Sequence, residues 1–274
     1  MRTVHASLQE AEDTIGHTDA RALIANFLGV DRAWLIANPM HVLTETQDAT
    51  IDSLVAQRVL GQPVAYLLGK REFYSREFDV GPDVLIPRPE TESLVEAVLA
   101  RVAPDAAIVD LGTGSGAIAV TLACERPLAR IVATDVSEAA LRVARANAQR
   151  LCPERIEFVT GSWYAPLAAR RFDAIVANPP YIRAGDLHLG KGDLRFEPRA
   201  ALTDESTDGL ASVRAIIEGA GAHLIPGGWL LLEQGDDQAD ACRALRASAG
   251  FDDLVSIPDL AGIPRVAGGR FARC

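Results

Sequence analysis

The tetrapeptide Asn178-Pro179-Pro180-Tyr181 has the residue types needed to hold a flat NH₂ group. It follows the apolar run 172–177, which predicts a strand. The Asn178 side-chain oxygen and a following backbone carbonyl can each accept one N–H of an amide or aromatic amine, whose nitrogen is a poor nucleophile. Proline stiffens the loop and has no competing N–H, and the tyrosine ring can lie against a flat group. We expect Asn178, Pro179 and Tyr181 to be catalytic, and Pro180 to share in substrate binding, with positioning as the main source of rate enhancement. The structural alternative is a proline turn with a capping asparagine.

A glycine-rich loop lies upstream, between the predicted strand 107–111 and a predicted helix. A ligand can approach such backbone closely because glycine has no Cβ, and the helix N-terminus beside it is positive. A nucleotide-like cofactor is therefore expected here, bound by Asp110, Gly112, Thr113, Gly114, Ser115 and Gly116. Asp135 ends the next strand, where its carboxylate can accept both ribose hydroxyls, although a helix cap would explain it equally well.

Two cofactors are compatible with this loop. Its glycines also fit the looser form of the dinucleotide fingerprint, which by itself is a weak signal. Asp110 would repel a pyrophosphate, whereas the same carboxylate can hold the ammonium group of a methionine moiety. Since the segment 178–181 has no hydride-transfer character, we predict S-adenosylmethionine as the cofactor and the flat NH₂ group as the methyl acceptor. Trp163, after the third strand, can cover the adenine, although burial would also explain it.

The elements that must position these residues begin near residue 106. From there, short apolar runs alternate with helical stretches, as is typical of a mostly parallel, doubly wound α/β sheet. The expected helices include 138–149 and 209–223, and the expected strands are 107–111, 130–134, 156–159, 172–177, 229–233, 254–257 and 270–273. Because ligands bind outside the carboxyl ends of such strands, the glycine loop and the tetrapeptide should face one crevice.

The chain before residue 106 has a different pattern. Apolar positions recur at three-to-four spacing in the first seventy or so residues, which predicts a small helical domain. Apolar residues then flank Gly81-Pro82-Asp83, which predicts a β-hairpin that turns there. The prolines on either side of Arg88 favour extended backbone, as in a rigid linker, and Thr91 can start the next helix. We therefore divide the chain into a helical domain (1–70), a hairpin linker (71–88) and a methyltransferase domain (89–274).

Composition limits the partners of the protein. The 274 residues are 49% hydrophobic, enough for a full α/β core and an appended domain, and the formal net charge is −10. This acidic balance argues against direct nucleic-acid binding, which needs clustered Lys and Arg, and suits a basic protein partner. Residues 1–13 lack the features of a secretory signal and no apolar run reaches transmembrane length, so we expect a soluble, cytoplasmic monomer. No metal site is expected, because the four cysteines are scattered.

The sequence resembles the HemK-type protein-(glutamine-N5) methyltransferases, specifically the release factor glutamine methyltransferases, over nearly its whole length. The segments that carry the resemblance are 61–69, 71–74, 85–92, 110–120, 178–182, 197–202 and 259–265. It implies a Rossmann-like class I S-adenosylmethionine-dependent methyltransferase domain with a seven-stranded sheet, and an N-terminal domain that recognises the substrate. It also implies that Gly112 to Gly116, Asp135, Trp163 and Asn178 bind the cofactor.

By the same resemblance, the substrate is the glutamine of the Gly-Gly-Gln motif in class I peptide chain release factors. Arg88 and Glu90, within the segment 87–92 that favours this substrate, join the expected substrate-binding residues. A sister family that modifies a ribosomal protein glutamine shares the tetrapeptide but departs from that segment. Adenine-N6 methylation of nucleic acid would also use a flat NH₂ group, although the acidic balance disfavours it. A binding module without turnover is a further hypothesis that the residues leave open.

Overall fold

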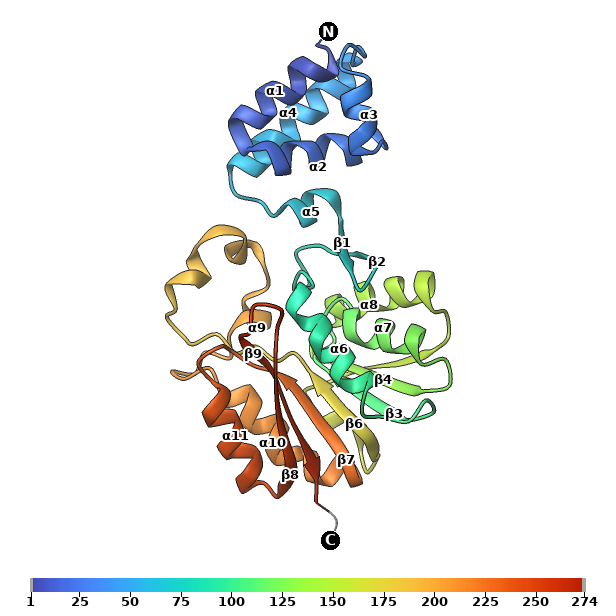
Figure 1. The fold of residues 1–274 in the computed structure, drawn as a ribbon, viewed down its shortest axis with the longest axis vertical. Helices are drawn as coiled ribbons and strands as arrows, with labels where there is room; N and C mark the ends of the chain where they lie inside the picture. The colour runs from blue at the N-terminus through green and yellow to red at the C-terminus, as the bar shows by residue number, and fades with distance from the viewer. Residues whose placement is uncertain (1, 273–274) are drawn as a thin grey trace.

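A computed structural model of the chain describes residues 2–272, and it places a group of helices at one end and an α/β unit at the other (Figure 1). The N-terminal helices are α1 Val4–Ile15, α2 His17–Leu28, α3 Arg32–Ala37, α4 Glu45–Val59 and α5 Val64–Leu68. The apolar faces of the first four of these helices enclose a separate small core that includes Val4, Ile24 and Ile51. Side chains also set where these helices begin, since Thr44 and Gln47 form a reciprocal capping box at the start of α4.

The hairpin between the two parts turns at a different place from the one predicted. Strands β1 (Lys70–Phe73) and β2 (Arg76–Asp79) are joined through Tyr74 and Ser75, both with positive φ. Gly81-Pro82-Asp83 does form a turn, in which the Val84 N–H donates to the Gly81 carbonyl at 3.1 Å, but the hairpin predicted around it was wrong, because residues 80–86 form no strand. Burial explains the difference: this register brings Phe73 and Phe78 edge to face, with ring centroids 6.0 Å apart, in the main core.

The predicted mostly parallel, seven-stranded sheet is confirmed. Its strands are β3 Ala107–Leu111, β4 Arg130–Asp135, β5 Ile156–Thr160, β6 Phe172–Ala177, β7 Leu224–Glu233, β8 Phe251–Pro258 and β9 Pro264–Phe271. Their order is β5-β4-β3-β6-β7-β9-β8, and only β9 runs antiparallel to its neighbours. The last strand lies earlier than the predicted 270–273, of which residue 273 is outside the described residues.

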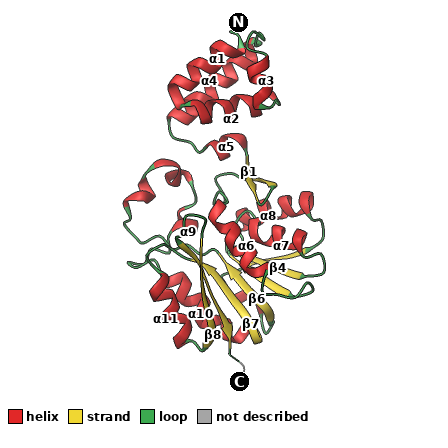
Figure 2. Cartoon of the chain, in the orientation of Figure 1, coloured by secondary structure: helices red, strands yellow, loops and turns green. Residues whose placement is uncertain are grey.

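Helices cover both faces of the sheet (Figure 2). The helices α6 Glu92–Leu99, α7 Ala117–Glu125 and α8 Glu138–Leu151 share one core, and α10 Ala211–His223 and α11 Ala239–Ser248 share the other. Successive residues of β3, such as Ile108 and Val109, enter opposite cores. The helix predicted at Thr91 is present, but the Thr91 side chain does not cap it. No helix in the described part of the chain is long and apolar enough to cross a membrane.

A long excursion between β6 and α10 reaches back toward the N-terminal helices (Figure 1). It contains η3 Leu187–Gly190, η4 Gly192–Phe196 and α9 Arg199–Leu202. Arg58 of α4 pairs with Asp19 at 2.7 Å and with Asp193 of the excursion at 2.8 Å. The pair with Asp193 ties the helical part to the α/β part, while the domain boundaries at residues 70 and 88 stay a prediction.

One buried side chain connects the hairpin to the glycine loop. Asn147 of α8 is fully buried and accepts from the Asp79 N–H at 2.7 Å. Its Nδ2 donates to the Asp79 carbonyl at 3.0 Å and to the Ser115 carbonyl at 2.9 Å. The end of β2 and the cofactor loop are therefore held by the same amide.

We expect Asn147→Ala to lower the free energy of unfolding by about 3 kcal/mol, because three hydrogen bonds of about 1 kcal/mol each are lost in the core. Urea denaturation followed by circular dichroism would measure the change. The exposed Asn26 of α2 provides the control, since Asn26→Ala should change stability by less than about 0.5 kcal/mol. Equal effects of the two substitutions would contradict the structural role given to Asn147.

Candidate active site

The strand register brings the predicted site residues to one edge of the sheet. Leu111 at the end of β3 pairs with Ala177 at the end of β6, and Ala177 pairs with Leu232 of β7. The residues that follow these strands therefore leave the sheet side by side. Because the chain crosses from β5 back to β6 on the other side of β3, this edge is the topological switch point where ligands bind in open α/β sheets.

The glycine loop is a tight connection with left-handed backbone. Gly112, Gly114 and Gly116 have φ values of 74°, 56° and 82°, which favour glycine, and α7 begins at the next residue. The N–H groups of Gly112 and Thr113 both donate to the Thr134 carbonyl of the neighbouring strand, at 2.8 and 2.9 Å. Thr113 and Ser115 are buried, so their side chains fill space beneath the loop.

Asp135 lies across this loop and helps to shape it. Its Oδ2 accepts from the Gly114 N–H at 2.9 Å, and its Oδ1 accepts from the Ser137 N–H at 2.9 Å. Ser137, and not Asp135, caps α8 by accepting from the Ala140 N–H. The half-buried Asp135 carboxylate still has lone pairs free for further donors, as two ribose hydroxyls would require.

Asp110 beneath the glycine loop has a buried carboxylate oxygen without a hydrogen-bond partner. It is fully buried, its Oδ2 accepts from the Thr113 hydroxyl at 2.6 Å, and its Oδ1 makes no hydrogen bond of normal geometry. Burial raises the pKa of Asp110 to about 7, while the Thr113 hydroxyl and the Ala119 N–H oppose that rise. An unpartnered buried carboxylate oxygen is costly unless a donor or a cation reaches it.

Trp163 lies over the glycine loop. Its backbone has a φ of 44°, and its ring atom Cζ3 lies 3.4 Å from where a Cβ on Gly112 would stand. The indole is only partly buried against the core, so part of the side chain stays accessible. This placement suits a flat side chain that covers one face of a bound ring.

The residues around the loop fit S-adenosylmethionine. Asp110 Oδ1 is a buried acceptor without a partner, which suits the ammonium of the methionine moiety, and Asp135 can accept from the ribose. A Cβ built on Gly114 would meet nothing within 4 Å, so the space above the loop is open to a ligand. The carboxylate in this position disfavours a dinucleotide pyrophosphate.

The tetrapeptide is held by a hydrogen-bond network that the sequence analysis missed. Asn178 Nδ2 donates to Thr91 Oγ1 at 3.2 Å, and the Thr91 hydroxyl donates to Glu233 Oε2 at 2.6 Å. The Tyr181 hydroxyl donates to Glu233 Oε1 at 3.0 Å. Pro179 is buried and Pro180 is half-buried, so the whole turn is anchored.

The network could be foreseen only in part. Glu233 ends an apolar strand as Asp135 does, and Asp110 is one residue from the end of its own strand, so the same signal was present for Glu233. Gln238 was not foreseen either: its Nε2 donates to the Tyr181 carbonyl at 3.0 Å and to the Asp208 carbonyl at 3.1 Å. No local pattern marks such a residue, because its partners are distant in the sequence.

Arg88 and Glu90 differ in their surroundings. Arg88 forms an ion pair with Glu197, whose side chain is fully buried and also accepts from the Ile86 N–H at 2.9 Å. Arg88 is thus committed to holding the excursion, although 30% of its side chain stays exposed. Glu90 is exposed near the network, where its charge contributes to a raised pKa of Glu233. Their expected role in substrate binding stays a prediction.

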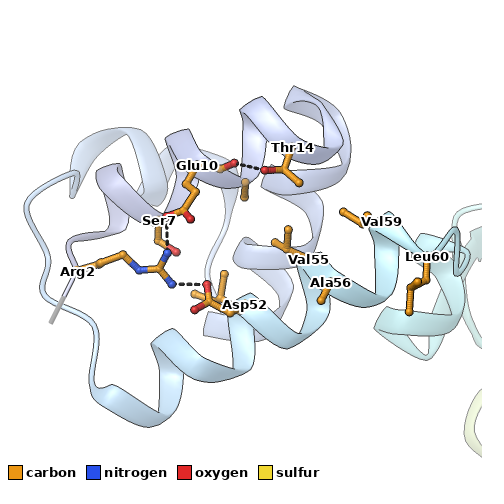
Figure 3. Close-up of a pocket in the computed structure, with 11 residues that line it drawn as sticks. Arg2, Ser7, Glu10, Thr14, Asp52, Val55, Ala56, Val59 and Leu60 are labelled. Atoms are coloured by element: carbon orange, nitrogen blue, oxygen red, sulfur yellow. Dashed lines mark hydrogen bonds and ion pairs between the residues drawn. The ribbon is translucent and has the colours of Figure 1, made fainter.

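A cleft also lies elsewhere, between α1 and α4 (Figure 3). It has a volume of about 520 Å³, and Arg2 on its rim pairs with Glu10 and Asp52. Its remaining lining is mostly apolar, including Val55 and Val59. Its two carboxylates are already paired with Arg2, and neither the glycine loop nor the tetrapeptide lines it, so we place the active site at the sheet edge. Among residues 2–272, no cluster of His, Cys, Asp and Glu could hold a metal ion.

The fold and this site define a Rossmann-like methyltransferase. Residues 73–191 match the family model of the methyltransferase small domain, and residues 1–69 match that of the PrmC N-terminal domain. A methyltransferase from Pyrococcus furiosus has a similar fold, with a TM-score of 0.55 at 20% identity over 79% of this chain and 97% of that one.

Similar proteins identify the family of methyltransferases to which the chain belongs. The release factor glutamine methyltransferase of Bordetella pertussis is 50% identical over 264 residues, which cover 94% of this chain and 96% of that protein. The one from Burkholderia pseudomallei is 52% identical over 260 residues, with coverage of 92% and 91%. The chain belongs to the release factor glutamine methyltransferase family.

Asp110→Asn should raise the stability of the protein at high pH while it weakens cofactor binding. Because burial raises the pKa of Asp110 from 3.8 to about 7, folding is progressively less favourable for this group as the pH rises between those values. The substitution removes that loss. The stability of the variant minus that of wild type should therefore be larger at about pH 8.5 than at about pH 5.5. It also removes the charge offered to the ammonium, so affinity for S-adenosylmethionine should fall about ten- to hundredfold.

Urea denaturation at the two pH values and isothermal titration calorimetry measure these effects. Asp105→Asn is the matched control, since Asp105 is exposed and should affect neither property. Unchanged cofactor affinity in Asp110→Asn would contradict the assignment of the ammonium to this carboxylate.

Proposed function

We propose that this chain transfers a methyl group from S-adenosylmethionine to the side-chain amide nitrogen (N5) of the glutamine in the Gly-Gly-Gln motif of class I peptide chain release factors. The observation that carries the proposal is the position of Asn178, which follows β6 beside the glycine loop and has its Nδ2 turned to Thr91. Its Oδ1 is therefore left to face a donor. The names of the relatives supply the substrate.

The protein's contribution to this reaction is to hold and orient. When bound, S-adenosylmethionine supplies a methyl group on a sulfonium, which is electrophilic without further activation. We assign its binding to Asp110, the segment 112–116, Asp135 and Trp163. Asn178 Oδ1 and the Pro179 carbonyl each accept one N–H of the substrate amide, which fixes its plane and leaves one face of the nitrogen toward the donor.

The proton balance needs no strong base before transfer. The amide nitrogen forms a bond to the methyl carbon while the carbon–sulfur bond breaks, and the N-methylated amide then loses one proton to water. Glu233 is not required as that base, because both of its oxygens already accept hydroxyl protons from Thr91 and Tyr181. Rate enhancement then comes mainly from placing nitrogen and methyl about 3 to 3.5 Å apart in line.

The helical residues 1–70 are assigned to substrate recognition. Arg58 and the Leu60 carbonyl contact the excursion that follows the tetrapeptide, through Asp193 and Arg195. A protein that presents a glutamine to the sheet edge can therefore reach both parts of the chain. We further propose that the enzyme acts as a cytoplasmic monomer without direct nucleic-acid contacts, for which the net charge of −10 is the support.

Labelled S-adenosylmethionine tests the substrate directly. The protein is incubated separately with a class I release factor, with that factor carrying Ala in place of the motif glutamine, with a ribosomal protein and with duplex DNA. Label should appear in the release factor and vanish in its Gln-to-Ala variant. Label in the ribosomal protein or the DNA instead would refute the proposal.

Asn178→Ala should lower the rate of transfer by about 100-fold or more, because the amide loses the acceptor that orients it. Affinity for S-adenosylmethionine should stay close to that of wild type, since Asp110 and Asp135 remain. Single-turnover kinetics and calorimetry separate the two quantities. Asn26→Ala serves again as the control, and full turnover by Asn178→Ala would rule out the mechanism.

A further inference from the structure

A chain of hydrogen bonds runs from Asn178 through Thr91 to Glu233, and along it each residue donates to the next. We propose that Glu233 and Thr91 are positioning residues that orient the Asn178 amide, so that Oδ1 and not Nδ2 faces the substrate, and that this orientation selects a carboxamide over a carboxylate. The inference rests on the proposed function, because it names how that site distinguishes glutamine from glutamate.

Glu233 fixes which groups in this chain donate and which accept. Its side chain is buried at the end of β7, and each of its oxygens accepts a hydroxyl proton, from Thr91 at 2.6 Å and from Tyr181 at 3.0 Å. An ionised carboxylate can only accept hydrogen bonds. Burial raises the pKa of the Tyr181 phenol, which keeps that donor protonated as well.

Thr91 donates to Glu233 and can therefore only accept from Asn178. A hydroxyl has one proton, and the proton of Thr91 is committed to Glu233. Toward Asn178, at 3.2 Å, Thr91 Oγ1 can therefore only accept. Thr91, the last residue of η1 (Pro89–Thr91), is itself buried, so water does not readily replace either partner.

Asn178 is the residue that this chain orients. The oxygen and nitrogen of an amide have nearly the same shape, so hydrogen bonding and not packing decides which way it points. An acceptor at Thr91 requires the NH₂ end to lie there, which directs Oδ1 to the opposite side. The reversed amide would set two acceptors against each other and leave the Thr91 lone pair unsatisfied.

Selectivity follows from what Oδ1 can bind. A glutamine side chain offers N–H donors to Oδ1, whereas a glutamate carboxylate has none to offer and is repelled by it. When Glu233 is ionised, its negative charge adds to that repulsion. A site that presents an acceptor therefore rejects the substrate analogue that cannot donate, even though the two side chains have the same size.

Protonation of Glu233 should remove the constraint on which way the Asn178 amide points. Burial raises the pKa of Glu233, while the Thr91 and Tyr181 hydroxyls and Arg265 of β9 lower it and Glu90 of η1 raises it further. Once protonated, Glu233 can donate to Thr91, which frees the Thr91 proton to point at Asn178. Selectivity should therefore fall as the pH drops through this pKa.

Thr91→Val is the first test, because it removes the hydroxyl at nearly constant volume. The measured quantity is the ratio of affinities, by calorimetry, for a release factor and for its Gln-to-Glu variant. Wild type should favour glutamine strongly, and Thr91→Val should reduce the ratio at least about tenfold. The rate of methyl transfer should fall as well, while affinity for S-adenosylmethionine changes less than about twofold.

The matched controls separate orientation from stability. Thr91→Ser keeps the hydroxyl and should restore the wild-type ratio. Thr121→Val makes the same exchange in α7, at a fully buried threonine whose hydroxyl has no partner, and should leave the ratio unchanged. Glu233→Gln replaces the obligatory acceptor with a group that can also donate, so its ratio should fall and lose its dependence on acidic pH.

The outcomes distinguish the inference from the proposed function. If wild type methylates the release factor and both Thr91→Val and Glu233→Gln keep its preference for glutamine, the positioning role is wrong. If wild type transfers no methyl group to the release factor, the proposed function fails, and the selectivity argued from it fails too. A loss of preference in Thr91→Val that Thr91→Ser restores supports the inference.

Discussion

The common edge at which β3, β6 and β7 end is the constraint on which the site depends. Leu111, Ala177 and Leu232 lie in register across three neighbouring strands, so the cofactor loop, the tetrapeptide and Glu233 must leave the sheet together. Parallel pairing with helices on both faces makes this edge rigid, because each strand is held on both sides. Positioning of that quality is what a methyl transfer without strong acid–base chemistry requires.

Two buried carboxylates at this edge are compensated in opposite ways. Glu233 accepts hydroxyl protons on both oxygens and so is satisfied within the protein. Asp110 has a partner on Oδ2 only, and its other oxygen is left for a ligand. The protein thus holds its substrate loop with one buried acid and keeps the other available for the cofactor, at a cost in stability that binding of a cation can offset.

The structure agrees with the sequence-based predictions where a feature depends on neighbouring residues, and departs from them where it depends on residues far apart in the chain. The glycine loop and most strand positions were predicted because they rest on neighbouring residues. The hairpin predicted around Gly81-Pro82-Asp83 was wrong because burial of Phe73 and Phe78, not the turn residues, sets the register. Thr91 begins a helix as expected, yet its hydroxyl bonds to Glu233, which lies 142 residues away.

The sequence by itself determined the class of fold, the cofactor loop and the tetrapeptide, since each depends on local backbone freedom, apolar periodicity or the chemistry of adjacent side chains. Only the tertiary structure decided which groups hold that chemistry in place. Asn147 at the loop, the half-satisfied Asp110 and the hydrogen bonds that orient Asn178 all join segments far apart in the chain. A hydrogen bond depends on distance and direction in space, and no pattern in the sequence encodes either.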